Sequence, residues 1–160
     1  MDKNLEIARE KLIDGEYTCV VLTRDGEYCS RERGVKPLLS LLDGACATKE
    51  AFAADKTVGA GAAHLYVLLG VRAIWARVIS VSAKQVLEDN NIEVFYDECV
   101  EYIINRRGDG MCPIEAAVAD AKDSHEAHAL ILEALKKLQS NQTNLCSDSK
   151  LCNKSKIFAV

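Results

Sequence analysis

The 160-residue chain has little proline, few aromatic residues and no apolar run long enough to cross a membrane. It contains 2 prolines and 9 glycines, and 6% of its residues are aromatic. Its most apolar stretch, 58–71, falls short of the roughly 20 residues of a membrane helix. With 49% apolar and 28% charged residues, the composition is typical of a folded globular protein and excludes a disordered chain.

The chain also lacks an excess of basic residues. Twenty Lys and Arg stand against 24 Asp and Glu, which gives a net charge of -4 and argues against binding to extended nucleic acid or an anionic membrane. The acidic N-terminus does not resemble a secretory signal. We therefore expect a cytoplasmic protein whose seven cysteines are free thiols and whose partner is a small molecule.

The order of predicted elements indicates an α/β fold. Apolar periodicity and turn residues predict a helix over 5–13, a hairpin of strands 17–23 and 27–30, a short helix over 37–42, a central buried helix over 52–69, a strand over 72–79, a helix from Ser82, a strand over 92–96, and helices that begin at Pro113 and Asp123. Strands joined through a helix pair in parallel, so we expect a mixed sheet. Residues 1–138 form the predicted domain, and 139–160 a polar, flexible tail.

The densest unusual stretch is the segment from Asn105 to Glu115. Arg106 and Arg107 can form paired hydrogen bonds to a carboxylate or phosphate. Gly108 and Gly110 flank an aspartate and permit close backbone approach. The segment predicts an anion-binding loop, and its alternative is a solvated turn whose arginines pair with nearby acidic residues.

Two residues of the following helix could add chemistry. Pro113 at the first helical position makes Cys112 the expected N-cap, where the helix dipole would favour a thiolate nucleophile. Glu115 would lie in the first turn beside a bound ligand. The alternatives are a small buried cysteine and an ordinary first-turn glutamate.

A second candidate is Asp55-Lys56, expected at the start of the central helix. A carboxylate beside an ammonium group in a cleft could transfer a proton. The alternative is a first-turn aspartate stabilised by the helix dipole, with Lys56 in solvent. His64, on the same predicted helix, is expected to pack in the core.

Four segments together resemble a known family. They are Ser30-x-x-x-Gly34-Val-Lys-Pro-Leu-Leu, Ala54-Asp-Lys-x-Val-Gly59, the run 65–71, and Asn105-Arg-Arg-Gly-Asp-Gly-x-Cys-Pro-x-Glu115. The sequence resembles, over residues 5–138, a prokaryotic family of unknown function grouped with the cytidine-deaminase-like superfamily. The resemblance implies a three-layer fold, in which an N-terminal antiparallel hairpin is followed by parallel strands with helices on both faces, and a homo-oligomer.

The resemblance also bears on zinc. Zinc deaminases open the helix after the hairpin with His-x-Glu or Cys-x-Glu, and the helix after strand three with Pro-Cys-x-x-Cys. Aligned on the predicted elements, these positions fall on Asp55-Lys56 and on residues 80–84, which offer no thiolate to a metal. We therefore expect no cofactor, and no zinc at the usual deaminase positions.

The function expected from these features is binding of a nucleoside, nucleotide or similar small anion. A hydrolytic enzyme would use Asp55 or Asp109 as proton carrier, Lys56 and the arginines as electrophilic groups, and Cys112 as nucleophile. The alternatives are a non-catalytic ligand-sensing or interaction domain that retains the fold only, and a thiol-dependent role centred on Cys112. The sequence alone does not decide whether the protein is an enzyme.

Overall fold

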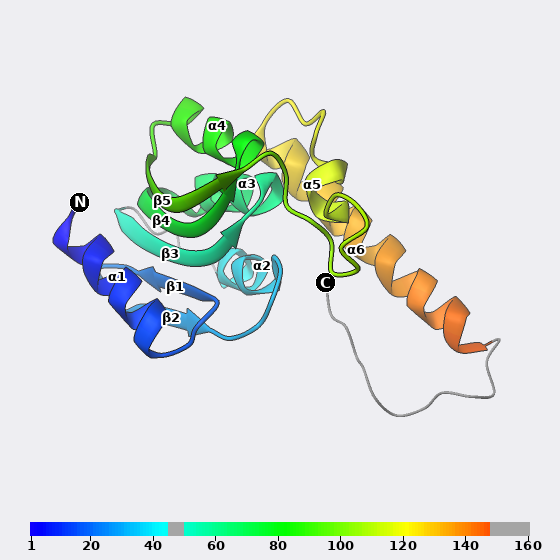
Figure 1. Cartoon of the computed structure of the whole chain (residues 1–160), viewed down its shortest axis with the longest axis horizontal. Helices are drawn as coiled ribbons and strands as arrows, with labels where there is room; N and C mark the ends of the chain where they lie inside the picture. The colour runs from blue at the N-terminus through cyan, green and yellow to red at the C-terminus, as the bar shows by residue number, and fades with distance from the viewer. Residues whose placement is uncertain (45–49, 148–160) are drawn as a thin grey trace.

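The computed structural model describes residues 1–44 and 50–147, with side chains to residue 142. Along the chain lie α1 (Lys3–Asp14), β1 (Cys19–Leu22), β2 (Glu27–Ser30), α2 (Lys36–Asp43), β3 (Ala51–Val58), α3 (Ala60–Leu69), β4 (Val71–Ser80), α4 (Val81–Asp89), β5 (Glu93–Val100), α5 (Pro113–Ala117) and α6 (Ser124–Ser147). Figure 1 shows the strands in one curved sheet, with α6 projecting from the body. The predicted α/β class is confirmed.

The sheet has five strands in the order β2-β1-β3-β4-β5. Strand β1 pairs antiparallel with β2 and β3, whereas β4 pairs parallel with β3 and β5. The hairpin turn closes where the Thr23 N–H donates to the Gly26 carbonyl at 2.8 Å. The predicted hairpin and mixed sheet are therefore confirmed.

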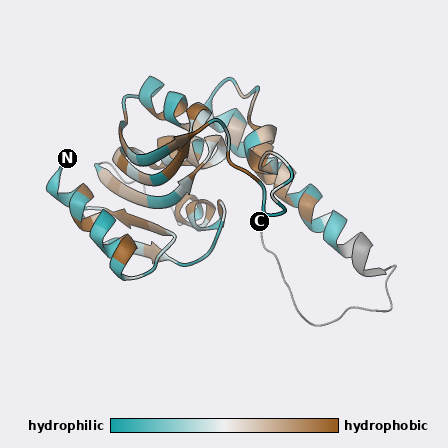
Figure 2. Cartoon of the chain, viewed as in Figure 1, coloured by the Kyte–Doolittle hydropathy of each residue, from teal (hydrophilic) through white to brown (hydrophobic). Residues whose placement is uncertain are grey.

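Helices cover both faces of the sheet. Helix α1 packs Leu5, Ala8 and Leu12 into one apolar cluster, which also contains Phe52 of β3 and Trp75 of β4. On the other face, α2, α3 and α4 share the larger cluster, and α5 and α6 pack outside α3. Figure 2 shows hydrophobic residues along the strands and inner helices, and polar residues on the outer side of α4. Helix α3 is therefore covered by protein on both sides.

The predicted central helix over 52–69 is wrong in its first half. Residues 51–58 form strand β3, and α3 begins at Ala60 after the extended Gly59. Strand β3 lies between β1 and β4 with both faces covered, so its small apolar residues do not alternate with polar ones. Without that alternation, the run of alanines reads as a helix.

Helix ends also depart from the predicted ones. Helix α4 begins one residue before Ser82, because the Ser80 hydroxyl accepts a hydrogen bond from the Ala83 N–H at 3.2 Å. Helix α6 continues to Ser147, so the predicted domain boundary at residue 138 falls inside a helix. Residues 148–160 of the predicted tail lie outside the described residues, and the division at 138 stays a prediction. Among the described residues, no helix has the length and apolarity needed to span a membrane.

Candidate functional site

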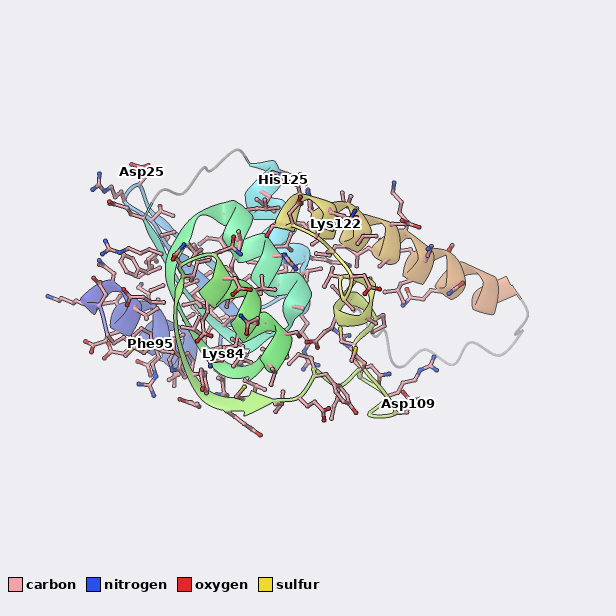
Figure 3. The ribbon with its side chains drawn as sticks, turned by 90° about the horizontal axis from the view of Figure 1, so that it is seen from above. Asp25, Lys84, Phe95, Asp109, Lys122 and His125 are labelled. Atoms are coloured by element: carbon pink, nitrogen blue, oxygen red, sulfur yellow. The ribbon has the colours of Figure 1, made fainter. Side chains whose placement is uncertain are left out.

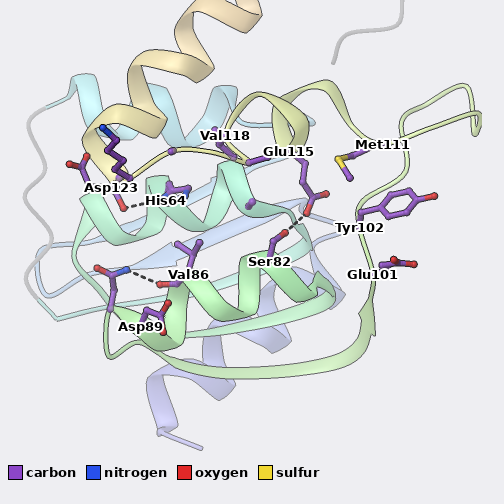
Figure 4. Close-up of a pocket in the computed structure, with 16 residues that line it drawn as sticks. His64, Ser82, Val86, Asp89, Glu101, Tyr102, Met111, Glu115, Val118 and Asp123 are labelled. Carbon is purple, nitrogen blue, oxygen red and sulfur yellow. Dashed lines mark hydrogen bonds between the residues drawn. The ribbon is translucent and has the colours of Figure 1, made fainter.

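A groove of about 620 Å³ lies between the outer surface of α3 and α4 and the segment that follows β5 (Figure 4). Its walls come from α3 and α4 on one side, and from the loop after β5, α5 and the start of α6 on the other. The lining residues used below are His64, Ser82, Val86, Asp89, Glu101, Tyr102, Met111, Glu115, Val118, Ala119, Lys122, Asp123 and Ser124. The groove thus joins parts of the chain that are far apart in sequence.

Glu115 fixes the two walls of the groove to each other. Its side chain is 4% exposed, and its Oε1 accepts a hydrogen bond from the Ser82 hydroxyl at 2.8 Å. Its Oε2 accepts from the Ile103 N–H at 2.6 Å. Gly59 leaves room for this contact, because a Cβ there would lie 3.1 Å from the Ile103 side chain. One carboxylate thereby connects α4, the loop after β5 and α5.

His64 lies at the other end of the groove. It is 7% exposed, and its Nδ1 shares a hydrogen bond of 3.0 Å with the Ser124 hydroxyl. Burial lowers its pKa, so the ring is neutral at pH 7. Its Nε2 has no hydrogen-bond partner among the described residues and is not among their buried unpartnered atoms. Because His64 lines the groove, Nε2 is left open towards it.

The start of α6 holds Ser124 in place beside His64. The Asp123 carboxylate accepts from the Glu126 N–H, and the Glu126 carboxylate accepts from the Lys122 N–H, both at 2.8 Å. This reciprocal arrangement satisfies backbone donors at the helix end, as the predicted helix start at Asp123 requires. The Glu126 N–H lowers the Asp123 pKa, which keeps that carboxylate charged in the groove wall.

A separate polar cluster lies inside the fold, between the sheet and α3. Asp55 of β3 accepts a 2.6 Å hydrogen bond from the Tyr66 hydroxyl and a 2.9 Å bond from the Thr57 N–H. The Tyr66 hydroxyl also lies 3.3 Å from Cys19 Sγ. Burial raises the pKa of Asp55 to about 7 and also raises that of the Cys19 thiol. Asp55 does not line the groove.

The arginine-bearing segment forms an exposed turn. Ile104 and Met111 pair as an antiparallel bridge, and the Asn105 N–H donates to the Gly110 carbonyl at 2.8 Å. Gly108 adopts a φ of 74°, a left-handed conformation that favours glycine. Asp109 accepts from the Asn105 side chain at 2.7 Å and lies at the tip of the turn (Figure 3).

Comparison with known proteins places this fold in a family. Residues 7–135 match a family described as a domain of unknown function, DUF1893. The chain belongs to the DUF1893 family. A solved structure of a DUF1893 family protein (TM1506) from Thermotoga maritima resembles it with a TM-score of 0.73 and 25% identity. The similarity covers 86% of this chain and 92% of that one, and no curated protein matches the chain.

The DUF1893 chain does not join Asp55 and Lys56 in one cleft. Both residues lie in β3, where neighbouring side chains point to opposite faces of the sheet. Asp55 faces Tyr66 of α3, and Lys56 therefore points to the face that α1 covers. The predicted placement of this pair at a helix start is wrong, because residues 51–58 form a strand.

Of the other predicted residues in this DUF1893 protein, only Glu115 lines the groove. Arg106 and Arg107 are exposed and have no side-chain partner among the described residues, so the proposed pairing with nearby acidic residues is absent there. Cys112 is the N-cap of α5, as predicted, and packs partly buried against the larger apolar cluster. Helix α5 spans only five residues, and the role of Cys112 as a nucleophile stays a prediction.

The groove itself was not predicted. His64 was expected to pack in the core, and it is buried, but one ring nitrogen faces the groove. Ser82 and Asp123 were expected only as the starts of two helices. A lone histidine and two residues at helix starts carry no spacing that would join them. Only the packing of α5 and α6 on α3 brings them together.

Proposed function

We propose that this DUF1893 protein is a cytidine-deaminase-like domain that binds a nucleoside-sized small molecule without deaminase zinc chemistry. The sheet supports the fold assignment, because an antiparallel hairpin precedes parallel strands and helices cover both faces. We further propose that the protein is a cytoplasmic homo-oligomer that does not bind extended nucleic acid, in keeping with its net charge of -4.

The two helix starts compared with zinc deaminases are not the ones expected from sequence. The helix after the hairpin is α2, which follows Gly34-Val35, and the helix after β3 is α3, which follows Gly59. Asp55-Lys56 and residues 80–84 therefore do not occupy these positions. Neither true helix start carries a histidine, cysteine or carboxylate in its first turn, so the donor set does not fit zinc.

The groove is the observation that carries the proposal. Its volume of about 620 Å³ lies within the range of about 300–1,000 Å³ typical of small-molecule sites. Val86 and Val118 give it apolar walls, and His64 and Ser82 add polar groups that can fix a ligand's orientation. The exposed Tyr102 and Met111 stand at its edge and offer surfaces for a flat base.

Hydrolysis is the second candidate function. The specific feature that favours it is His64, whose neutral ring keeps Nε2 open to the groove and could accept a proton from water. Asp55 and Cys112 do not line the groove, and Asp109 lies on the exposed turn outside it. Release of ammonia or of free base from bound nucleosides would support this role.

The binding proposal is tested by calorimetric titration of adenosine, cytidine and their monophosphates. Ala119 lines the groove, and Ala116 is an exposed alanine of α5 outside the lining. We expect a nucleoside to bind the wild-type protein, Ala119→Trp to weaken that binding about tenfold or more by filling the groove, and Ala116→Trp to leave it unchanged. Absence of binding by all four compounds at millimolar concentration, or equal losses in both variants, contradicts the proposal.

A further inference from the structure

We infer that the groove recognises a positively charged ligand, such as a nucleoside-sized amine, rather than an anion. This inference rests on the proposed function, because it names the ligand class of the same groove. Among the lining residues, the carboxylates are Asp89, Glu101, Glu115 and Asp123, and the single ammonium group belongs to Lys122. Charges in a partly enclosed site interact more strongly than in water, so this lining attracts cations and repels phosphates.

Hydrogen bonds leave part of this negative charge available. Asp89 uses its Oδ1 to accept from Gln85, and Asp123 uses its Oδ1 to accept from Glu126. No bond to Glu101 appears among the described residues. Each of these three carboxylates therefore keeps at least one oxygen for a ligand's N–H groups.

His64 gives an independent reason to place a ligand here. It is a polar side chain that is more than nine-tenths buried, and its Nε2 is unpartnered and open to the groove. Figure 4 shows His64 and Asp123 side by side at one end of the groove. This nitrogen is not among the buried unpartnered atoms of the described residues, so it is accessible and can accept a hydrogen bond from a ligand's N–H group in the groove. Because the ring is neutral, it does not offset the negative lining.

The arginines predicted to bind an anion do not change this balance. Arg106 and Arg107 are exposed residues of the turn between Ile104 and Met111, and neither lines the groove. They therefore add no positive charge to the lining. The observed geometry therefore reverses the sign of the ligand charge that the sequence suggests.

Three compounds that share one nucleoside and carry a cationic, a neutral or an anionic 5′ substituent test the inference. They are 5′-amino-5′-deoxyadenosine, adenosine and adenosine monophosphate, each titrated into the full chain at low and at high salt. We expect the amine to bind about fivefold more tightly than adenosine and the monophosphate to bind most weakly, with the preference reduced by salt. Equal affinities, or tighter binding of the monophosphate, would overturn the inference while leaving the proposed groove in place.

A matched pair of variants locates the effect. Asp123→Asn removes one charge from the groove and keeps a residue that caps helices equally well. Asp120→Asn makes the same change at an exposed position outside the lining. We expect Asp123→Asn to reduce the preference for the amine at least twofold and Asp120→Asn to leave it unchanged. If both variants lose the same preference for the amine, the net charge of the protein, and not a charge in the groove, sets that preference.

Failure of the proposed function is recognised separately. If none of the three adenosine compounds binds, the nucleoside proposal fails, and spermidine then decides the inference. Spermidine that shifts the His64 ring resonances in the wild-type protein, but not in Ala119→Trp, supports a groove for amines. Spermidine without effect on His64 overturns that idea as well.

Discussion

Asp55 and Glu115 are two carboxylates with the same kinds of hydrogen-bond donor and different surroundings. Each accepts one bond from a side-chain hydroxyl and one from a backbone N–H. Asp55 lies between the sheet and α3, whereas Glu115 borders the groove and connects three segments. The contrast teaches that a carboxyl group with a raised pKa does not by itself mark a site, because Asp55 is such a group and does not line the groove.

The largest expected effect concerns the proton on Asp55. Its pKa is 3.8 in the unfolded chain and about 7 in the folded one, so the folded state holds the proton more tightly. The stability that this group contributes is complete below pH 4 and is lost as the pH rises to about 7. Relative to the wild type, Asp55→Asn should therefore gain up to about 4 kcal/mol between pH 4 and pH 8.

Urea unfolding at a series of pH values measures this difference. Asp109→Asn removes an exposed carboxyl group and serves as the control for the loss of one charge. If the Asp55→Asn and wild-type stabilities run parallel between pH 4 and pH 8, Asp55 is not the group that holds the proton, and the contrast with Glu115 disappears.

The next largest effect concerns Glu115. Glu115→Ala removes the acceptor of both the Ser82 hydroxyl and the Ile103 N–H, and should cost about 3 kcal/mol of unfolding free energy. Glu115→Gln keeps one acceptor oxygen and should cost less. Hydrogen exchange measures the local loss of stability. Glu115→Ala should accelerate exchange, relative to the wild type, more in the loop after β5 than in the β1–β3 pairs. If Glu115→Ala costs less unfolding free energy than Glu115→Gln, the carboxylate does not connect the walls of the groove.

The smallest effect concerns the exposed arginines. Arg106 and Arg107 are exposed and have no side-chain hydrogen bond or ion pair among the described residues, so changing both to alanine should alter stability by no more than about 0.5 kcal/mol. The affinity for an uncharged nucleoside should not change either. Thermal unfolding and calorimetric titration measure both quantities. A marked loss of affinity for adenosine monophosphate alone would return the anion to the arginine turn and make the groove secondary.

Local signals in the sequence predicted the parts of the fold that depend on few neighbouring residues. Asp25-Gly26 located the hairpin turn, and Asp123 with Glu126 located the start of α6. Strand β3 was missed because its alanines are covered on both faces of the sheet. Such a run shows neither the two-residue alternation of a half-buried strand nor the period of an amphipathic helix. That error placed Asp55 at a helix start and shifted the comparison with zinc deaminases by one element.

The candidate site was predicted less well, since its chemistry depends on segments that meet only in the folded state. Glu115 was nominated as a first-turn residue beside a bound ligand. It does lie in the first turn of α5 and lines the groove, and its contact with a ligand stays a prediction. His64 and Ser124 are 60 residues apart, and no local pattern joins them.

Gly61 has a consequence for how the groove is assembled. A Cβ at this position would lie 2.4 Å from the Ile114 side chain, so α5 can rest on α3 only where that methyl group is missing. Contacts between such distant parts of a chain form late, because a long loop must close first. We therefore expect the docking of α5 on α3, which completes the groove, to come late in folding. A ligand that contacts both walls would stabilise the docked state. Its concentration would then set the free energy needed to detach α5 and α6 from α3.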